Sequence, residues 1–267
     1  MSGLTRGEGG EEFAYSVSLN PFSFNQTVDG KLTAQSYNQL YFEDRQAGQG
    51  SQGTDTCFDG LAQRALTRSG MNIYLQNPSL VKQAIAMSFW LPGEDQTLYG
   101  IPEREDTLAL KVTTGTDPYE IFATDRLHSP GSPGPLYGSI PYVMGLSAES
   151  AVGLLWVNSA KTTIDIDRVN AGLQVTYASE ANTFELFMFA SNGGMNTTRV
   201  KNVGRDLSTI SGFAPLPLIH TLGYHFCKWY YVSADMMMQR NTNFTNYGFP
   251  VDVLWSDIEW AQQNDDS

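Results

Sequence analysis

The chain has 267 residues, of which 41% are hydrophobic, 12% aromatic and 16% charged, a composition typical of a globular protein rather than of a disordered chain. The formal net charge is −12 and the sequence has no cluster of lysine and arginine, so we expect neither nucleic acid nor an anionic membrane surface as a partner. No run of about eighteen apolar residues predicts a membrane helix. The first residues lack the apolar core of a signal peptide, which predicts a cytoplasmic protein if this N-terminus is genuine.

The two cysteines, Cys57 and Cys227, are too few for a disulfide framework. Cys227 lies within the apolar run LGYHFCKWYY, which favours a buried free thiol. The three histidines share no spacing typical of metal ligands, and the sequence contains no phosphate-binding loop. We therefore expect no metal site and no cofactor.

The chain opens with a segment rich in glycine and glutamate, residues 1–12, for which we expect a disordered tail. Beyond it, apolar residues alternate with polar ones in several segments, as in half-buried strands. These segments are 13–19, 85–91, 108–112, 162–166 and 173–177. Nearly continuous apolar runs, typical of strands covered on both faces, occur at 140–146, 152–157 and 184–190. Many short strands separated by turn clusters predict a large β-sandwich over residues 13–214.

The pattern changes near Pro215. A buried strand is predicted at 222–231, a helix from Ser233 to about Phe244, and a second strand at 251–255. A strand, a helix and a strand in this order form a β-α-β unit, which comes with parallel sheets. Residues 215–267 are therefore predicted to begin a second domain, although one such unit cannot cover its own strands.

Seven motifs resemble stretches of glycoside hydrolase family 31, particularly its glucosidase II α-subunit group, in that family's order and roughly its spacing. They are LNPFSF (19–24) with LYFE (40–43), YGIPEREDTLALKV (99–112), DPYEIFATD (117–125), LYGSIPYV (136–143), GLLWVNSA (153–160), LGYHFCKWYY (222–231) and VDVLWSDIEW (251–260). Members of this family begin with a galactose-mutarotase-like β-sandwich, which a (β/α)8 barrel with the active site follows. The resemblance implies a mainly β fold, in which this sandwich precedes the first β-α-β unit of an incomplete barrel.

The resemblance also implies that the chain is an N-terminal fragment of a retaining α-glucosidase. Such enzymes need a nucleophile and an acid/base whose carboxyl groups lie roughly 5 Å apart. Asp257 and Glu259 are two residues apart at a strand end and would face the same side. In the family, however, both catalytic groups lie on later barrel strands. We therefore assign no catalytic residue to this chain and expect it to be inactive alone.

Three residues match family positions that bind substrate. Asp257, in the WxDI motif, would bind sugar hydroxyls in the −1 subsite, or would merely hold the loop at the strand end. Tyr231 would wall the sugar pocket, or would pack in the core. Asp125 would reach the substrate from a sandwich loop, or would cap its own turn. Gly100, in the YGIP motif, is expected to serve the fold as a turn residue.

The resemblance further implies α-linked glucosides or the glucose of N-glycans as substrates, a possible β subunit as partner, and the lumen of the endoplasmic reticulum as location. One departure follows Asp257: Trp260 and AQQNDDS stand where the family group has a histidine and a basic, aromatic-rich stretch. Two other hypotheses therefore stay open. The sandwich could be a carbohydrate-binding or subunit-interaction module, or the chain could be a truncated product without function.

Overall fold

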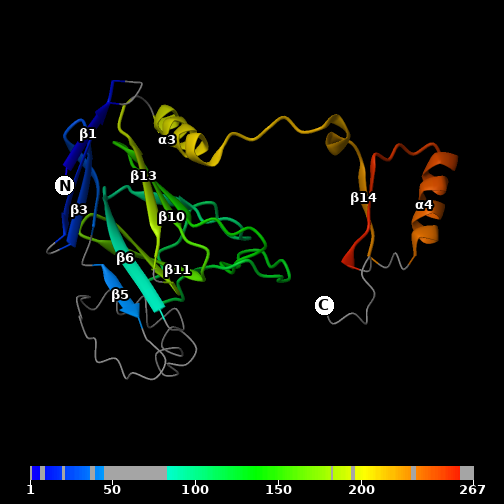
Figure 1. Cartoon of the computed structure of the whole chain (residues 1–267), viewed down its shortest axis with the longest axis horizontal. Helices are drawn as coiled ribbons and strands as arrows, with labels where there is room; N and C mark the ends of the chain where they lie inside the picture. Colours follow the sequence, from blue (N-terminus) through cyan, green and yellow to red (C-terminus); the bar gives the residue numbers. More distant parts are fainter. Residues whose placement is uncertain are drawn as a thin grey trace. The chain divides into compact units, whose positions relative to one another are not determined.

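The structure is a computed structural model that describes residues 2–6, 10–19, 22–36, 40–44, 83–181, 183–193, 196–229 and 233–258. Cys57, Tyr231 and Glu259 lie outside these residues. The chain divides into two compact units, Met1–Ser211 and Gly212–Ser267, and each is described by itself (Figure 1).

Unit 1 contains two antiparallel sheets. The larger sheet has the strand order β1-β2-β3-β4-β6-β12-β11-β8, with β5 paired to β6, and the smaller sheet has the order β13-β10-β9-β7. The strands of the larger sheet are β1 (Ser2–Arg6), β2 (Glu12–Leu19), β3 (Phe22–Val28), β4 (Lys31–Ser36), β5 (Tyr41–Asp44), β6 (Gln83–Pro92), β8 (Tyr119–Ile121), β11 (Thr162–Val169) and β12 (Gly172–Ser179). Those of the smaller sheet are β7 (Thr97–Gly100), β9 (Tyr142–Leu146), β10 (Ala151–Val157) and β13 (Glu185–Ser191).

The two sheets face each other across one apolar core. Phe89 and Tyr177 project into it from the larger sheet, and Leu154 and Trp156 project from the smaller one; all four are fully buried. The rings of Trp156 and Tyr177 stack across the core with their centroids 5.3 Å apart. Two sheets that share an inner layer of side chains form a β-sandwich. The predicted mainly β fold is thus confirmed.

Helix α3 (Asn196–Ser211) covers the outer face of the smaller sheet. Its fully buried Val203 packs with Ala151 of β10 and Phe189 of β13. The sequence analysis predicted no helix here. Threonine, asparagine and glycine, which are weak helix formers, make up much of α3, so packing of its apolar face against the sheet stabilises it more than propensity does.

The expected disordered tail is wrong for residues 2–6, which form the edge strand β1. This strand pairs antiparallel with β2, from Ser2 opposite Ser16 to Arg6 opposite Glu12. Pairing at a sheet edge uses backbone groups, so it does not require the apolar alternation that this segment lacks.

The strand predicted at 108–112 is also wrong. Leu108 is 83% exposed, and the Thr107 hydroxyl donates to a carbonyl two residues later, at 2.8 Å. Leu110 donates its N–H to the Leu98 carbonyl of β7 at 2.8 Å, and Lys111 donates its N–H to the Tyr119 hydroxyl of β8 at 2.8 Å. Local side-chain hydrogen bonds of this kind compete with a sheet ladder.

The sequence analysis predicted three strands to be buried on both faces, and this prediction is only partly right. It is confirmed for most of β10, whereas β9 alternates and only the end of β13 is buried. Every residue of β12, predicted to alternate, is buried. Its polar face is closed by hydrogen bonds, since Thr176 bonds with Ser88 at 2.8 Å and accepts from Gln174 at 3.1 Å. Polar side chains that bond with one another can thus lie buried on a strand whose sequence predicts a half-exposed one.

Unit 2 contains the predicted β-α-β unit. A 3₁₀ helix (Ile219–Leu222) precedes β14 (His225–Cys227), α4 (Ala234–Asn246) and β15 (Val253–Trp255), and the two strands pair in parallel. Ser233 caps α4 as predicted, and its side chain accepts a hydrogen bond from the Met236 N–H at 3.3 Å. Both strands, as described, are shorter than the runs predicted at 222–231 and 251–255. No described helix of the chain is long and apolar enough to cross a membrane.

Candidate functional site

Asp257 lies two residues beyond β15, at the carboxyl end of the parallel strand pair. Its Oδ1 accepts a hydrogen bond from the Ile258 N–H at 2.8 Å, and its Oδ2 accepts one from the Cys227 thiol at 3.6 Å. The register opposes Cys227, the last residue of β14, to Trp255, which brings the thiol to the side chain two residues further on. The half-buried carboxylate is therefore held in place by two donors and keeps lone pairs for further donors.

Cys227 corrects one prediction, because the thiol expected to be buried belongs to an exposed cysteine. Its apolar sequence neighbours suggested a core strand. In unit 2, however, α4 lies on one side only of the strand pair, and no residue of α4 is buried. The sequence showed the apolar run around Cys227 but not its contact with Asp257, which depends on the strand register.

Trp255 and His225 form a second pair on the same two strands. The Trp255 indole N–H donates to His225 Nδ1 at 3.0 Å, and His225 Nε2 lies 3.1 Å from the Thr221 carbonyl oxygen. Because Nδ1 accepts, Nε2 carries the hydrogen and donates it, which is the pattern of a neutral imidazole. The sequence analysis left His225 without a role because it considered only metal spacing. The structure shows that it orients the aromatic ring of the WxDI motif.

Asp125 lies in unit 1, on the loop between β8 and β9. Its Oδ1 accepts a hydrogen bond from the Tyr137 hydroxyl at 2.8 Å, and the carboxylate is exposed. The Thr124 N–H donates to the Leu136 carbonyl at 2.9 Å, so the two arms of the loop are joined beside Asp125. Asp125 does not cap its own turn through these contacts. A tyrosine twelve residues later orients it.

Arg104 anchors this loop to the sandwich. Its guanidinium donates to the carbonyls of Ile101 at 2.7 Å and Glu120 at 3.1 Å, and to that of Pro133, and it lies 5.0 Å from the centre of the Tyr119 ring. Burial lowers the pKa of Arg104, and the three carbonyls replace the water that the charge has lost. The sequence analysis missed this residue, although it lies within the quoted motif YGIPEREDTLALKV.

The structure thus places Asp257 with Cys227 in unit 2 and Asp125 with Tyr137 in unit 1. Tyr231 lies outside the described residues. Among the residues that the structure describes, no three histidine, cysteine, aspartate or glutamate side chains form a group that could hold a metal ion.

The profile of the glycosyl hydrolase 31 N-terminal galactose mutarotase-like domain matches residues 5–165, and that of the glycosyl hydrolases family 31 TIM-barrel domain matches residues 214–267. Neutral alpha-glucosidase AB of Sus scrofa is 31% identical over 201 residues, which cover 67% of this chain and 20% of that protein. The chain therefore spans about a fifth of the length of this curated relative.

Two solved structures are similar in fold. A crystal structure of a glucosidase II alpha subunit, DNJ-bound, superposes with a TM-score of 0.68 at 20% identity, covering 97% of this chain and 30% of that one. A crystal structure of an ER glucosidase II heterodimeric complex, of a catalytic subunit and the binding domain of a regulatory subunit, gives a TM-score of 0.65 at 21% identity, with the same coverage.

Proposed function

Because the chain belongs to glycoside hydrolase family 31, we propose that it supplies the N-terminal sandwich and the first barrel strands of a retaining α-glucosidase, and that Asp257 is its main sugar-binding group. One observation carries this proposal. Asp257 lies at the carboxyl end of a parallel strand, where (β/α)8 barrels place their functional groups, and the Ile258 N–H and the Cys227 thiol fix its orientation.

Asp257 would accept hydrogen bonds from hydroxyls of the sugar in the −1 subsite. Ionised carboxylates form strong hydrogen bonds with hydroxyl donors, and a fixed carboxylate orients the ring without reorganisation. Tyr231, four residues after Cys227, would provide an aromatic wall for the ring. Asp125, oriented by Tyr137, would bind a hydroxyl from the side of the sandwich loop. These residues bind and orient the substrate.

The cleavage itself needs a nucleophile and an acid/base whose carboxyl groups lie about 5 Å apart. We assign neither role to a residue of this chain, so the proposal includes that the chain alone does not hydrolyse glucosides. The substrates of the whole enzyme would be α-linked glucosides, including the glucose of N-glycans. A regulatory subunit such as that of the heterodimeric relative is the proposed partner, and the endoplasmic reticulum lumen is the proposed location.

Two measurements on the purified chain test this. No turnover of p-nitrophenyl α-glucoside is expected, and saturation-transfer NMR should detect weak binding of methyl α-glucoside. Asp257→Asn should weaken this binding about tenfold, because it removes a charged acceptor. Asp235→Asn, an exposed aspartate in the first turn of α4, is the matched control and should change nothing. Turnover that Asp257→Asn abolishes, or binding that it leaves unchanged, would overturn the proposal.

A further inference from the structure

A cavity of about 450 Å³ lies at one end of the sandwich. Small-ligand pockets have volumes of roughly 300–1,000 Å³, so the cavity is large enough for one. Its walls come from five turns or strand ends that are distant in sequence. Its lining includes one lysine, Lys31, three acidic residues, Glu94, Asp95 and Glu149, and several hydroxyl and amide residues.

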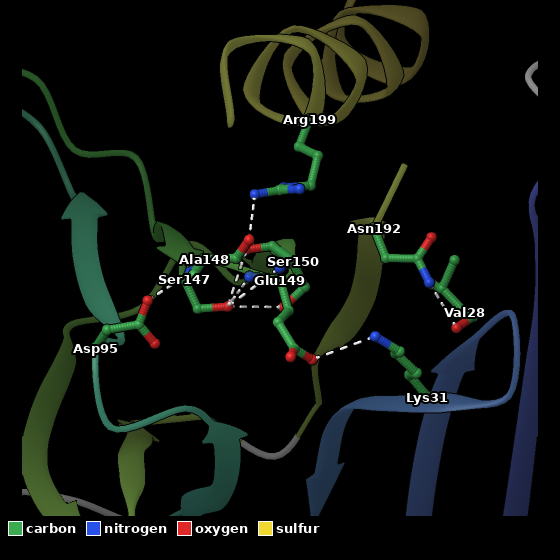
Figure 2. A network of polar contacts seen from close by, with 9 residues as sticks. All are labelled: Val28, Lys31, Asp95, Ser147, Ala148, Glu149, Ser150, Asn192 and Arg199. Carbon is green, nitrogen blue, oxygen red and sulfur yellow. Dashed lines mark hydrogen bonds and ion pairs between the residues drawn. The ribbon is translucent and has the colours of Figure 1, made fainter. Parts of the chain in front are cut away.

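The turn between β9 and β10 forms a rigid wall of this cavity (Figure 2). The Ala148 N–H donates to Asp95 Oδ2 at 2.6 Å, and the Ala148 carbonyl accepts from Arg199 Nη2 at 2.6 Å. Ser147 Oγ accepts from the N–H groups of Glu149 and Ser150, at 3.3 and 3.1 Å. Arg199 comes from α3 and is 5% exposed. Because burial of a charged group is costly, a buried arginine that holds a surface turn indicates that the fold maintains this turn.

Lys31, the first residue of β4, reaches the cavity and pairs with Glu149 of the β9–β10 turn. Lys31 Nζ lies 3.4 Å from Glu149 Oε2, and both side chains are largely exposed, so the ion pair is weak and can open. Asp95 Oδ1 accepts no hydrogen bond from a described residue, while Asn192 is fixed by donation to the Val28 carbonyl at 2.8 Å. Lys31 is a pure donor, whereas Asp95 and Glu149 are pure acceptors.

This mixture of groups selects the ligand by its chemistry. An anion would be repelled by Glu94, Asp95 and Glu149, whereas a cation would compete with Lys31, which already pairs with Glu149. A hydroxyl both donates and accepts, so a molecule with several adjacent hydroxyls matches ammonium and carboxylate together. None of the residues that line the cavity is aromatic, so such a ligand would be held by its hydroxyl edge rather than by stacking.

The cavity is separate from the loop that carries Asp125. Strand β11 begins at Thr162, opposite Ile121 at the end of β8, and the loop with Asp125 follows Ile121 directly. The other end of β11 leads into the turn with Ala171, which lines the cavity. The cavity and the loop with Asp125 therefore lie at opposite ends of an eight-residue strand.

We propose that this cavity binds a neutral, hydroxyl-rich ligand, the end of a saccharide chain, between Lys31, Glu149 and Asp95. It is an ancillary site, and it does not depend on the role proposed for Asp257. The bound sugar donates hydroxyl hydrogens to Glu149 and Asp95 and accepts from Lys31.

The test is a titration of the ¹⁵N-labelled full chain with maltotriose, followed by NMR. Saturable shifts are expected at the amides of Lys31, Ala148 and Glu149. Lys31→Ala and Glu149→Gln should each weaken the affinity about tenfold, since each removes one charge-assisted hydrogen bond. Both side chains are exposed, so the variants should fold. The matched control is Lys201→Ala, an exposed lysine of α3.

Two further variants separate this proposal from the proposed function. Asp125→Asn and Asp257→Asn should leave these shifts unchanged, and a loss of the shifts in either variant would overturn the proposal. An absence of shifts at the cavity, or equal affinity in both cavity variants and the control, would also overturn it. Sorbitol should bind more weakly than maltotriose, and equal binding would overturn the saccharide assignment. Binding of putrescine in place of maltotriose would show a cation site instead.

Discussion

Substitution of Ser179 by alanine should destabilise unit 1 through a single lost hydrogen-bond acceptor. Ser179 is fully buried at the end of β12. Its Oγ accepts from the Trp156 indole N–H at 2.9 Å and bonds with Thr162 Oγ1 at 2.6 Å. Alanine is only slightly smaller, so the cavity left behind adds little.

The magnitude follows from what each partner loses. Trp156 is fully buried and its indole nitrogen is only a donor, so its N–H would be left without an acceptor, at a cost of about 1–3 kcal/mol. Thr162 keeps its hydrogen bond to the Ala160 carbonyl at 3.1 Å and loses less. We expect a loss of about 2 kcal/mol in the free energy of unfolding. With a urea m-value of about 2 kcal/mol/M, the midpoint would fall by about 1 M.

The assay is urea unfolding followed by tryptophan fluorescence. Ser18→Ala, which changes an exposed serine of β2, is the matched control and should shift the midpoint by less than about 0.3 M. In a Trp156→Phe background there is no indole N–H to satisfy, so Ser179→Ala should cost clearly less than in the parent chain. Equal costs in both backgrounds, or no loss in the parent, would refute the reasoning.

Three more predictions concern the fold. Gly100 has a φ of +116°, and a Cβ at this position would collide with the Tyr142 carbonyl. Gly100→Ala should therefore lower the free energy of unfolding, measured in urea, by about 2 kcal/mol or more. An unchanged urea midpoint would contradict this. Burial raises the pKa of the Tyr142 hydroxyl to about 12, above the value of about 10 in the unfolded chain. The protonated hydroxyl therefore contributes fully to stability below pH 10, and this contribution is lost as the pH rises towards 12. Tyr142→Phe should flatten the pH profile of the free energy of unfolding between about pH 10 and 12, and an unaltered slope would contradict the raised pKa. Apolar side chains of unit 2 such as Leu216 are almost fully exposed, which favours association between copies of the chain. Sedimentation should therefore show association of the full chain and a monomer for residues 1–211. A monomeric full chain would contradict this prediction.

The sandwich and the β-α-β unit could be predicted because both follow from residue patterns within short stretches of the sequence. Large apolar residues recur at every second position in the sequences of β6 and β11, and Ser233 stands directly before the helix that it caps. Helix α3 could not be predicted in this way, because its stability comes from Val203 packing on a sheet assembled from distant segments. The edge strand β1 was missed because its pairing uses backbone groups.

The candidate site shows the same division. The family resemblance located Asp257 and Asp125 at a strand end and on a sandwich loop, where the structure places them. Their partners could not be predicted, since the contact between Cys227 and Asp257 depends on the register of two parallel strands. The bond from Tyr137 depends likewise on closure of a loop by Arg104.

The central claim is that Asp257 binds hydroxyls of an α-linked glucoside at the carboxyl end of the strand pair. The most direct measurement is a crystal structure of the purified chain with a bound α-glucoside. We expect the Asp257 carboxylate within hydrogen-bond distance of a sugar hydroxyl. A bound sugar that does not contact Asp257 would contradict the account.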